Sequence, residues 1–165
     1  MSADNQQESL DAEWIVGFVD GEGCFHVAIN KQPKMKIGWQ VLPEFRIVQH
    51  KRDIDILYKI QKNLGIGQIT RNHGDRFEVR IRGLENLKKL IKFFEKHHLQ
   101  TTKKKNFELF CQIIYLMERK DHLNQKGLMK IALLASSMNN RVKSKYLESS
   151  ETICRTSDYN DQMKI

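Results

Sequence analysis

A carboxylate beside closely spaced glycines is the feature of this sequence best suited to chemistry. Residues 14–23 read Trp-Ile-Val-Gly-Phe-Val-Asp-Gly-Glu-Gly, which places Gly17 and Gly21 on one face of a predicted helix. Glycine inside a helix costs about 1 kcal/mol relative to alanine, and close packing of two helix backbones is one reason to keep it. If two such helices pack about a two-fold axis, two Glu22 carboxylates meet. A divalent cation between them would offset their repulsion, and Mg²⁺ also bridges phosphates, so this arrangement suits metal-assisted phosphodiester chemistry.

Polar side chains alternate with apolar ones in four segments, residues 24–30, 37–49, 66–71 and 76–82, which predicts a one-sided sheet. Its polar face carries residue types that bind base edges and phosphates, and such a face can lie in a major groove. A merely solvated sheet face would show the same alternation. The candidates for DNA contact on this face are His26, Ala28, Asn30, Gln40, Leu42, Glu44, Arg46, Gln68, Thr70, Asn72, Arg76, Glu78, Arg80 and Arg82.

The net charge of +8 is unevenly distributed along the chain. Residues 1–29 hold six acidic residues and no lysine or arginine, whereas residues 30–105 hold 19 lysines and arginines against seven acidic residues. A basic block of this kind indicates a polyanionic partner. A basic surface that serves solubility alone would give the same composition.

Helices are expected around these strands. Asp11 can cap the first helix, and residues 53–64, 84–97 and about 103–118 have helical spacing of their apolar residues. Asn124 can cap a last helix. The predicted order is α-β-β-α-β-β-α followed by two further helices, in one domain over residues 1–140 with a polar, flexible tail over 141–165.

The composition favours an intracellular protein that does not cross a membrane. No apolar run reaches the roughly 18 residues that a membrane span needs. The first 13 residues include acids but no lysine or arginine, which argues against a signal or transit peptide. Three scattered cysteines, Cys24, Cys111 and Cys154, suggest reduced thiols. The excess of lysine over arginine favours an AT-rich genome, so we expect an organelle or a bacterial cytoplasm.

The segment 14–23 resembles the signature of the LAGLIDADG homing endonuclease family, with glutamate in place of the final aspartate. The segments 98–107 and 120–128, followed by 137–139, are similar to the family's later pattern, so that the resemblance covers about residues 11–140. It implies an α+β fold, an αββαββα core with a curved antiparallel four-stranded DNA-binding sheet and extra C-terminal helices. It also implies a site-specific double-strand DNA endonuclease of the intron homing type.

The resemblance assigns roles at the end of the first helix. Glu22 corresponds to the acid that binds Mg²⁺ or another divalent cation, and the carbonyl of Gly21 to a second metal ligand. Asp20 corresponds to an acid that accepts hydrogen bonds at the helix end.

Further catalytic roles follow from the same resemblance. Gln49 corresponds to a glutamine that orients solvent near the scissile phosphate. Lys103 is the first choice for the basic residue beside that phosphate and Lys104 the second, because the segment can slide by one position. A further basic residue can act near this glutamine, and the choice between Lys51 and Arg52 for this role stays open.

A single motif copy implies a homodimer that binds a long pseudo-palindromic duplex. The helix contact between the two subunits would then involve Trp14, Gly17, Phe18 and Gly21.

Two other functions share these features. An RNA maturase or a non-catalytic DNA-binding regulator can have the same fold, but such a protein often lacks the motif acid, and Glu22 and Gln49 are present here. A generic RNA-binding domain predicts exposed aromatic residues on the sheet for base stacking. The polar face of the predicted sheet has none, so this reading ranks last.

Overall fold

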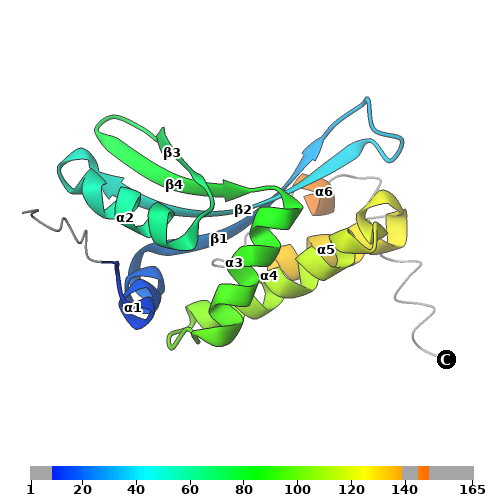
Figure 1. Ribbon diagram of the computed structural model, residues 1–165. Helices are drawn as coiled ribbons and strands as arrows, with labels where there is room; N and C mark the ends of the chain where they lie inside the picture. Colours follow the sequence, from blue (N-terminus) through cyan, green and yellow to red (C-terminus); the bar gives the residue numbers. More distant parts are fainter. Residues whose placement is uncertain (1–8, 139–144, 149–165) are drawn as a thin grey trace, which may run out of the picture. The chain divides into compact units, whose positions relative to one another are not determined.

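The computed structural model describes residues 9–138 and 145–148 (Figure 1). The chain divides into unit 1, made of Met1–Cys24 and Phe45–Lys103, and unit 2, made of Phe25–Glu44 and Lys104–Ile165. Four strands form one sheet, whose hydrogen-bonded order is β1 (Gly23–Lys31), β2 (Trp39–His50), β4 (Arg76–Arg82) and β3 (Gln68–Arg71). Strands β3 and β4 are antiparallel.

Helix α1 (Ala12–Glu22) opens unit 1 and begins where its cap residue predicts. The Asp11 carboxylate oxygen Oδ1 accepts hydrogen bonds from the backbone nitrogens of Glu13, at 2.8 Å, and Trp14, at 3.2 Å. These bonds satisfy two of the backbone donors that a helix start leaves without a partner. The buried side of α1 consists of Ile15, Val16 and Val19.

Helices α2 (Ile54–Leu64) and α3 (Leu84–Lys96) pack against the β3–β4 part of unit 1 (Figure 1). A short 3-10 turn, η1 (Lys51–Asp53), leads from β2 into α2. The ring of Phe45 on β2 lies 6.2 Å from that of Phe94 on α3. Other apolar side chains buried in unit 1 come from both helices and from β4, and include Leu57, Ile60, Leu87, Leu90, Val79 and Ile81.

Unit 2 is built from β1, the first half of β2, and C-terminal helices. The C-terminal helices are α4 (Lys103–Glu118), the 3-10 turn η2 (Asp121–Leu123), α5 (Gln125–Ser136) and α6 (Lys145–Glu148). Phe25 on β1 packs against two rings of α4, with centroids 5.5 Å from Phe107 and 5.3 Å from Phe110. The Asn124 side chain caps α5 by accepting a hydrogen bond from the Gly127 backbone nitrogen at 2.8 Å.

The predicted order of elements is confirmed, and the helix expected at 103–118 has those bounds. Two strands begin two residues later than predicted, at Trp39 and Gln68. Each is preceded by a glycine of positive φ, Gly38 at 76° and Gly67 at 93°, a conformation that interrupts extended backbone. The single domain over residues 1–140 stays a prediction.

The predicted tail, residues 141–165, lies outside the described residues except for α6. There the Tyr146 side chain is buried and meets the Trp39 ring edge-on, with centroids 5.1 Å apart. Within the described part of the tail, one turn of helix therefore packs onto unit 2.

Among the described residues, no helix is both long and apolar enough to cross a bilayer. Within the described residues, neither Cys24 nor Cys111 is part of a disulfide bond, and Cys154 lies outside them.

Candidate functional site

The end of α1 presents the candidate metal-binding acid. Glu22 is the last residue of the helix, and both it and Gly21 are exposed. Gly23 follows in the first position of β1, and a Cβ there would lie 2.7 Å from Cγ1 and 2.8 Å from the carbonyl oxygen of Val19. Only glycine therefore fits this turn, which sets where the Glu22 carboxylate emerges. The role of Gly23 was not deduced from the sequence, although the final glycine of the motif was the signal for it.

Asp20 accepts hydrogen bonds, as the resemblance implied for this residue. One carboxylate oxygen, Oδ2, accepts from the Gln100 backbone nitrogen at 2.8 Å. The other, Oδ1, accepts from the Thr101 backbone nitrogen at 3.2 Å and from the Thr101 hydroxyl at 2.8 Å. These bonds tie the segment before α4 to the end of α1. A carboxylate with these three donors has little capacity left for a metal ion.

Lys103 is brought to the same end of α1. Its backbone nitrogen donates to the Thr101 hydroxyl oxygen at 3.2 Å, and its Nζ donates to the carbonyl oxygen of Gly23. Asp20, Thr101 and Lys103 thus form a continuous chain of hydrogen bonds that ends one residue after Glu22. Lys104 is exposed, and in the part of the chain that the structure describes no contact brings its ammonium to Glu22.

Gln49, the second to last residue of β2, is half-buried. Contacts among the described residues do not link its side chain to Glu22 or Lys103, so its role in orienting solvent stays a prediction. The two basic residues left open after it, Lys51 and Arg52, are both exposed, and Arg52 pairs with Asp53 at 3.3 Å. An exposed ion pair of this kind contributes little energy, but it turns Arg52 toward its neighbour.

The donor atoms at this site are oxygens, the type that a hard divalent cation binds, but they are too few to complete its coordination. Glu22 offers a carboxylate and Gly21 a backbone carbonyl, the oxygen donors that Mg²⁺ prefers. No group of three His, Cys, Asp or Glu side chains suited to a metal occurs within the described ranges. The described residues of one chain therefore offer only part of a ligand set for such a cation.

The glycine face of α1 is open in the single chain. Among the described residues, no atom outside the helix backbone and the neighbouring residues lies within 4 Å of a Cβ built at Gly17 or Gly21. Beside them Trp14 is 43% exposed and stacks on Phe18, with ring centroids 5.1 Å apart and planes at 16°. Packing within the described residues therefore does not require the two glycines, which suits the predicted contact with another helix. This contact stays a prediction.

The sheet face predicted to contact DNA keeps its alternation in unit 1. Arg80 lies opposite Gln68, and Glu78 opposite Thr70, in the antiparallel register of β3 and β4. The apolar residues of β4, Val79 and Ile81, are buried. Six other side chains of the predicted set are exposed or partly exposed in unit 1, namely Arg46, Gln68, Thr70, Asn72, Arg76 and Arg82.

The part of the predicted face in unit 2 shows the same alternation over β1 and the start of β2. Phe25, Ile29 and Val41 are buried. The predicted contact residues are exposed at Asn30 and Leu42 and partly exposed at His26, Ala28 and Gln40.

Two acidic residues expected on the exposed face are buried. Glu44 is 7% exposed and Glu78 is 0% exposed. Glu78 is covered because neighbouring side chains turn toward its carboxylate: Arg80 forms an ion pair with it, and Thr70 and Asn72 donate hydrogen bonds to it. Alternation predicted the correct face of the strand for Glu78. The exposure expected for its side chain was wrong, because these partners cover the carboxylate.

Known proteins resemble this chain over most of its length. The family model described as LAGLIDADG endonuclease matches residues 15–114. A Neurospora crassa protein named "Probable intron-encoded endonuclease 3" is 37% identical over 126 residues, which are 74% of this chain and 24% of that protein. The chain thus spans about a quarter of the length of this curated relative.

Solved structures of homing endonucleases have the same fold. The crystal structure of I-TnaI is 48% identical with a TM-score of 0.78, over 92% of this chain and 99% of that one. The meganuclease I-SmaMI, bound to uncleaveable DNA, is 34% identical with a TM-score of 0.83, over 86% of this chain and 49% of that one. The motif residues, the order of elements and these matches agree, and the chain belongs to the LAGLIDADG endonuclease family.

Proposed function

We propose that this chain is a site-specific double-strand DNA endonuclease of the intron homing type, which hydrolyses phosphodiester bonds with a divalent metal ion. The observation that carries the proposal is the end of α1, where the exposed Glu22 precedes the carbonyl that Lys103 contacts. A cation-binding carboxylate near an ammonium group is the combination that phosphodiester hydrolysis needs. Names of relatives support it, since one is named "Probable intron-encoded endonuclease 3" and I-SmaMI has a structure described as bound to cleaved DNA.

Each residue of the proposed site has a different role. When bound, a divalent cation supplies Lewis-acid stabilisation of the phosphate and a more acidic water molecule. The Glu22 carboxylate and the Gly21 carbonyl would hold it, with the remaining ligands from a second Glu22 and the DNA backbone. Lys103 offsets negative charge that develops at the phosphate, and Gln49 orients the attacking water.

The second Glu22 comes from a second copy of the chain in this proposal. The open face of Trp14, Gly17, Phe18 and Gly21 supports a contact between two α1 helices. The match to I-TnaI over 99% of that chain supports a protein with one motif copy, in contrast to the longer I-SmaMI. Each subunit then binds one half of a pseudo-palindromic target.

Sequence recognition is assigned to the polar face of the sheet. Its arginines, glutamines and asparagines can form bidentate hydrogen bonds with base edges in the major groove. The basic excess of the chain supplies phosphate contacts, so affinity should fall steeply with salt. Location in an organelle or a bacterial cytoplasm stays a prediction.

The proposal is tested by cleavage of a duplex in which the two exon edges flanking the gene are joined. The unaltered protein is expected to cut both strands with Mg²⁺ and not with EDTA. Glu22→Gln should slow cutting by more than about a hundredfold, because each subunit loses its metal-binding carboxylate. Its affinity for the duplex should change little, since binding rests on many phosphate contacts.

Glu95→Gln is the matched control, because it removes the same charge from an exposed position of α3. It should cut at the rate of the unaltered protein. Sequence-specific binding without any cutting in Mg²⁺ or Mn²⁺ would instead identify a regulator. Full-rate cutting by Glu22→Gln would remove Glu22 from the site.

A further inference from the structure

Glu78 is a fully buried acid in the middle of the candidate DNA-contact face. Its side chain has no solvent-exposed area, while the side chain of Arg80, two residues along β4, is 30% exposed. A carboxylate on a surface meant for DNA would repel phosphates if it were exposed. Its burial beneath its neighbours raises the question of what it does there.

The Glu78 carboxylate joins side chains from both strands of the hairpin. Its Oε1 pairs with Nη2 of Arg80 and accepts a longer hydrogen bond, 3.4 Å, from the hydroxyl of Thr70. Its Oε2 accepts from Nδ2 of Asn72 at 2.7 Å. Thr70 is the cross-strand partner of Glu78, and Asn72 follows the end of β3, where its backbone nitrogen bonds to the Arg76 carbonyl at 2.9 Å.

These contacts restrict the side chains that would read bases. A guanidinium has five donors in a planar fork, so an ion pair at one terminal nitrogen sets the direction of the others. The amide of Asn72 is oriented in the same way, because the nitrogen that donates to Glu78 turns its oxygen elsewhere. A long arginine held in one direction loses less conformational entropy when it binds a base than one that is free.

We propose that Glu78 is a positioning residue for sequence recognition: it does not contact DNA, but holds Arg80, Asn72 and Thr70 in the directions from which they read the target. This inference rests on the proposed function. The Glu78 carboxylate neutralises one positive charge of this surface, and it fixes the directions of the three side chains. Loss of the Glu78 charge should therefore lower discrimination between sequences while raising, or leaving unchanged, affinity for duplex DNA of any sequence.

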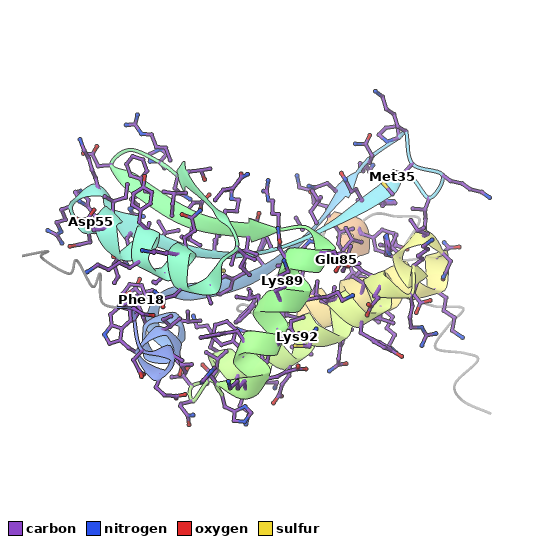
Figure 2. The ribbon with its side chains drawn as sticks, in the orientation of Figure 1. Phe18, Met35, Asp55, Glu85, Lys89 and Lys92 are labelled. Carbon is purple, nitrogen blue, oxygen red and sulfur yellow. The ribbon has the colours of Figure 1, made fainter. Side chains whose placement is uncertain are left out.

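The test is selection of binding sites from a randomised DNA duplex library by the full-length protein and its variants. Arg80→Ala first identifies the base pairs that Arg80 reads. At those base pairs Glu78→Gln is expected to lower discrimination by about tenfold, within the range that one bidentate contact provides. Affinity for unselected duplex should not fall. Glu85→Gln is the control, because its side chain is 80% exposed on α3 and the charge change is the same (Figure 2).

A double variant separates positioning from general stability. If Glu78 acts through Arg80, then Glu78→Gln should add no further loss at those base pairs in the Arg80→Ala background. Glu78→Asp guards against a variant that does not fold, since it keeps the charge and shortens the side chain by one methylene group. It should alter discrimination at the same base pairs.

The failures of the two proposals are distinguishable. Selection of no sequence by the unaltered protein, together with no cleavage, overturns the proposed function and this inference with it. A selected sequence that Glu78→Gln and Glu78→Asp both retain in full overturns the positioning role alone. An equal loss at every base pair, or further loss in the Arg80→Ala background, also overturns it.

Discussion

The ammonium group of Lys103 donates a hydrogen bond to the backbone carbonyl oxygen of Gly23, although 80 residues separate them in the sequence. This contact joins the first residue of α4 to the position after Glu22, the last residue of α1. The Lys103 ammonium is therefore held at the residue that follows Glu22 in the chain.

The position of the Lys103 ammonium leads to a prediction about two adjacent lysines. Lys103→Met should slow cleavage by at least about tenfold, because a group that stabilises developing charge at a phosphate contributes on that scale or more. Lys104→Met removes the same charge from an exposed neighbour and should slow cleavage much less. Single-turnover rates at saturating enzyme measure this effect apart from affinity. Equal losses in both variants would mean that total charge matters and position does not.

Thr101 is expected to act through Lys103. Its hydroxyl donates to Asp20 at 2.8 Å and accepts from the Lys103 backbone nitrogen at 3.2 Å. Thr101→Val removes both bonds, so we expect a several-fold slower cleavage step with unchanged DNA affinity and a loss of about 1 kcal/mol in the free energy of unfolding.

Two companion variants test this assignment. Thr101→Ser keeps the hydroxyl and should restore the cleavage rate. Thr102→Val, at the exposed next residue, should leave both rate and stability near those of the unaltered protein. A slow Thr101→Ser variant would show that the methyl group, and not the hydroxyl, is what matters.

The open face of α1 predicts a dimer that one substitution separates. The unaltered protein should be dimeric in solution without DNA, and Gly17→Leu should make it monomeric, because a large side chain would enter the contact between helices. Since no other segment of the described residues comes within 4 Å of a Cβ at Gly17, the single chain should still fold. Light scattering measures the oligomeric state, and circular dichroism shows whether the variant folds. Lys89→Leu, at an exposed position of α3, is the control for added apolar surface (Figure 2).

The outcome that contradicts this prediction is a monomer for the unaltered chain. In that case the second carboxylate would have to come from another source, and the paired-acid arrangement would fail. A Gly17→Leu protein that stays dimeric would place the subunit contact on a different surface.

His122 in η2 predicts a pH dependence of stability. Burial lowers its pKa below the usual 6.5, and the nearby Asp121 carboxylate opposes this shift only in part. The folded state therefore disfavours the charged imidazole. While His122 is neutral in both the folded and the unfolded state, it does not lower the free energy of unfolding. As pH falls below about 6.5, the unfolded chain binds the proton first and stability declines until the lowered pKa is passed.

Urea unfolding at pH 7.5, 6.5 and 5.5 measures this decline. His122→Gln should reduce it, because the variant has no proton to bind at this position. His73→Gln changes an exposed histidine in the β3–β4 turn and should keep the decline of the unaltered protein. An unchanged pH profile in His122→Gln would assign the decline to other groups.

The sequence by itself predicted the elements and the residue types of the candidate site. Asp11 and Asn124 cap their helices as predicted, since capping depends on residues within one turn of each other. The alternation in β4 placed Glu78 and Arg80 on one face because a strand has a period of two. Glycines four residues apart predict one face of α1 as a helix contact, and the motif's resemblance to the family predicts a metal-binding role for Glu22.

Only the tertiary structure decided which of these residues act together. Local spacing does not reveal that the Lys103 ammonium contacts a carbonyl 80 residues earlier in the chain, and the choice of Lys103 or Lys104 as the catalytic residue stays a prediction. Nor can alternation show that Glu78 is covered, because its cover consists of side chains on the neighbouring strand and the turn between them. Periodicity assigns a residue to a face, but its exposure and its partners depend on contacts between segments distant in sequence, and these form only when the chain has folded.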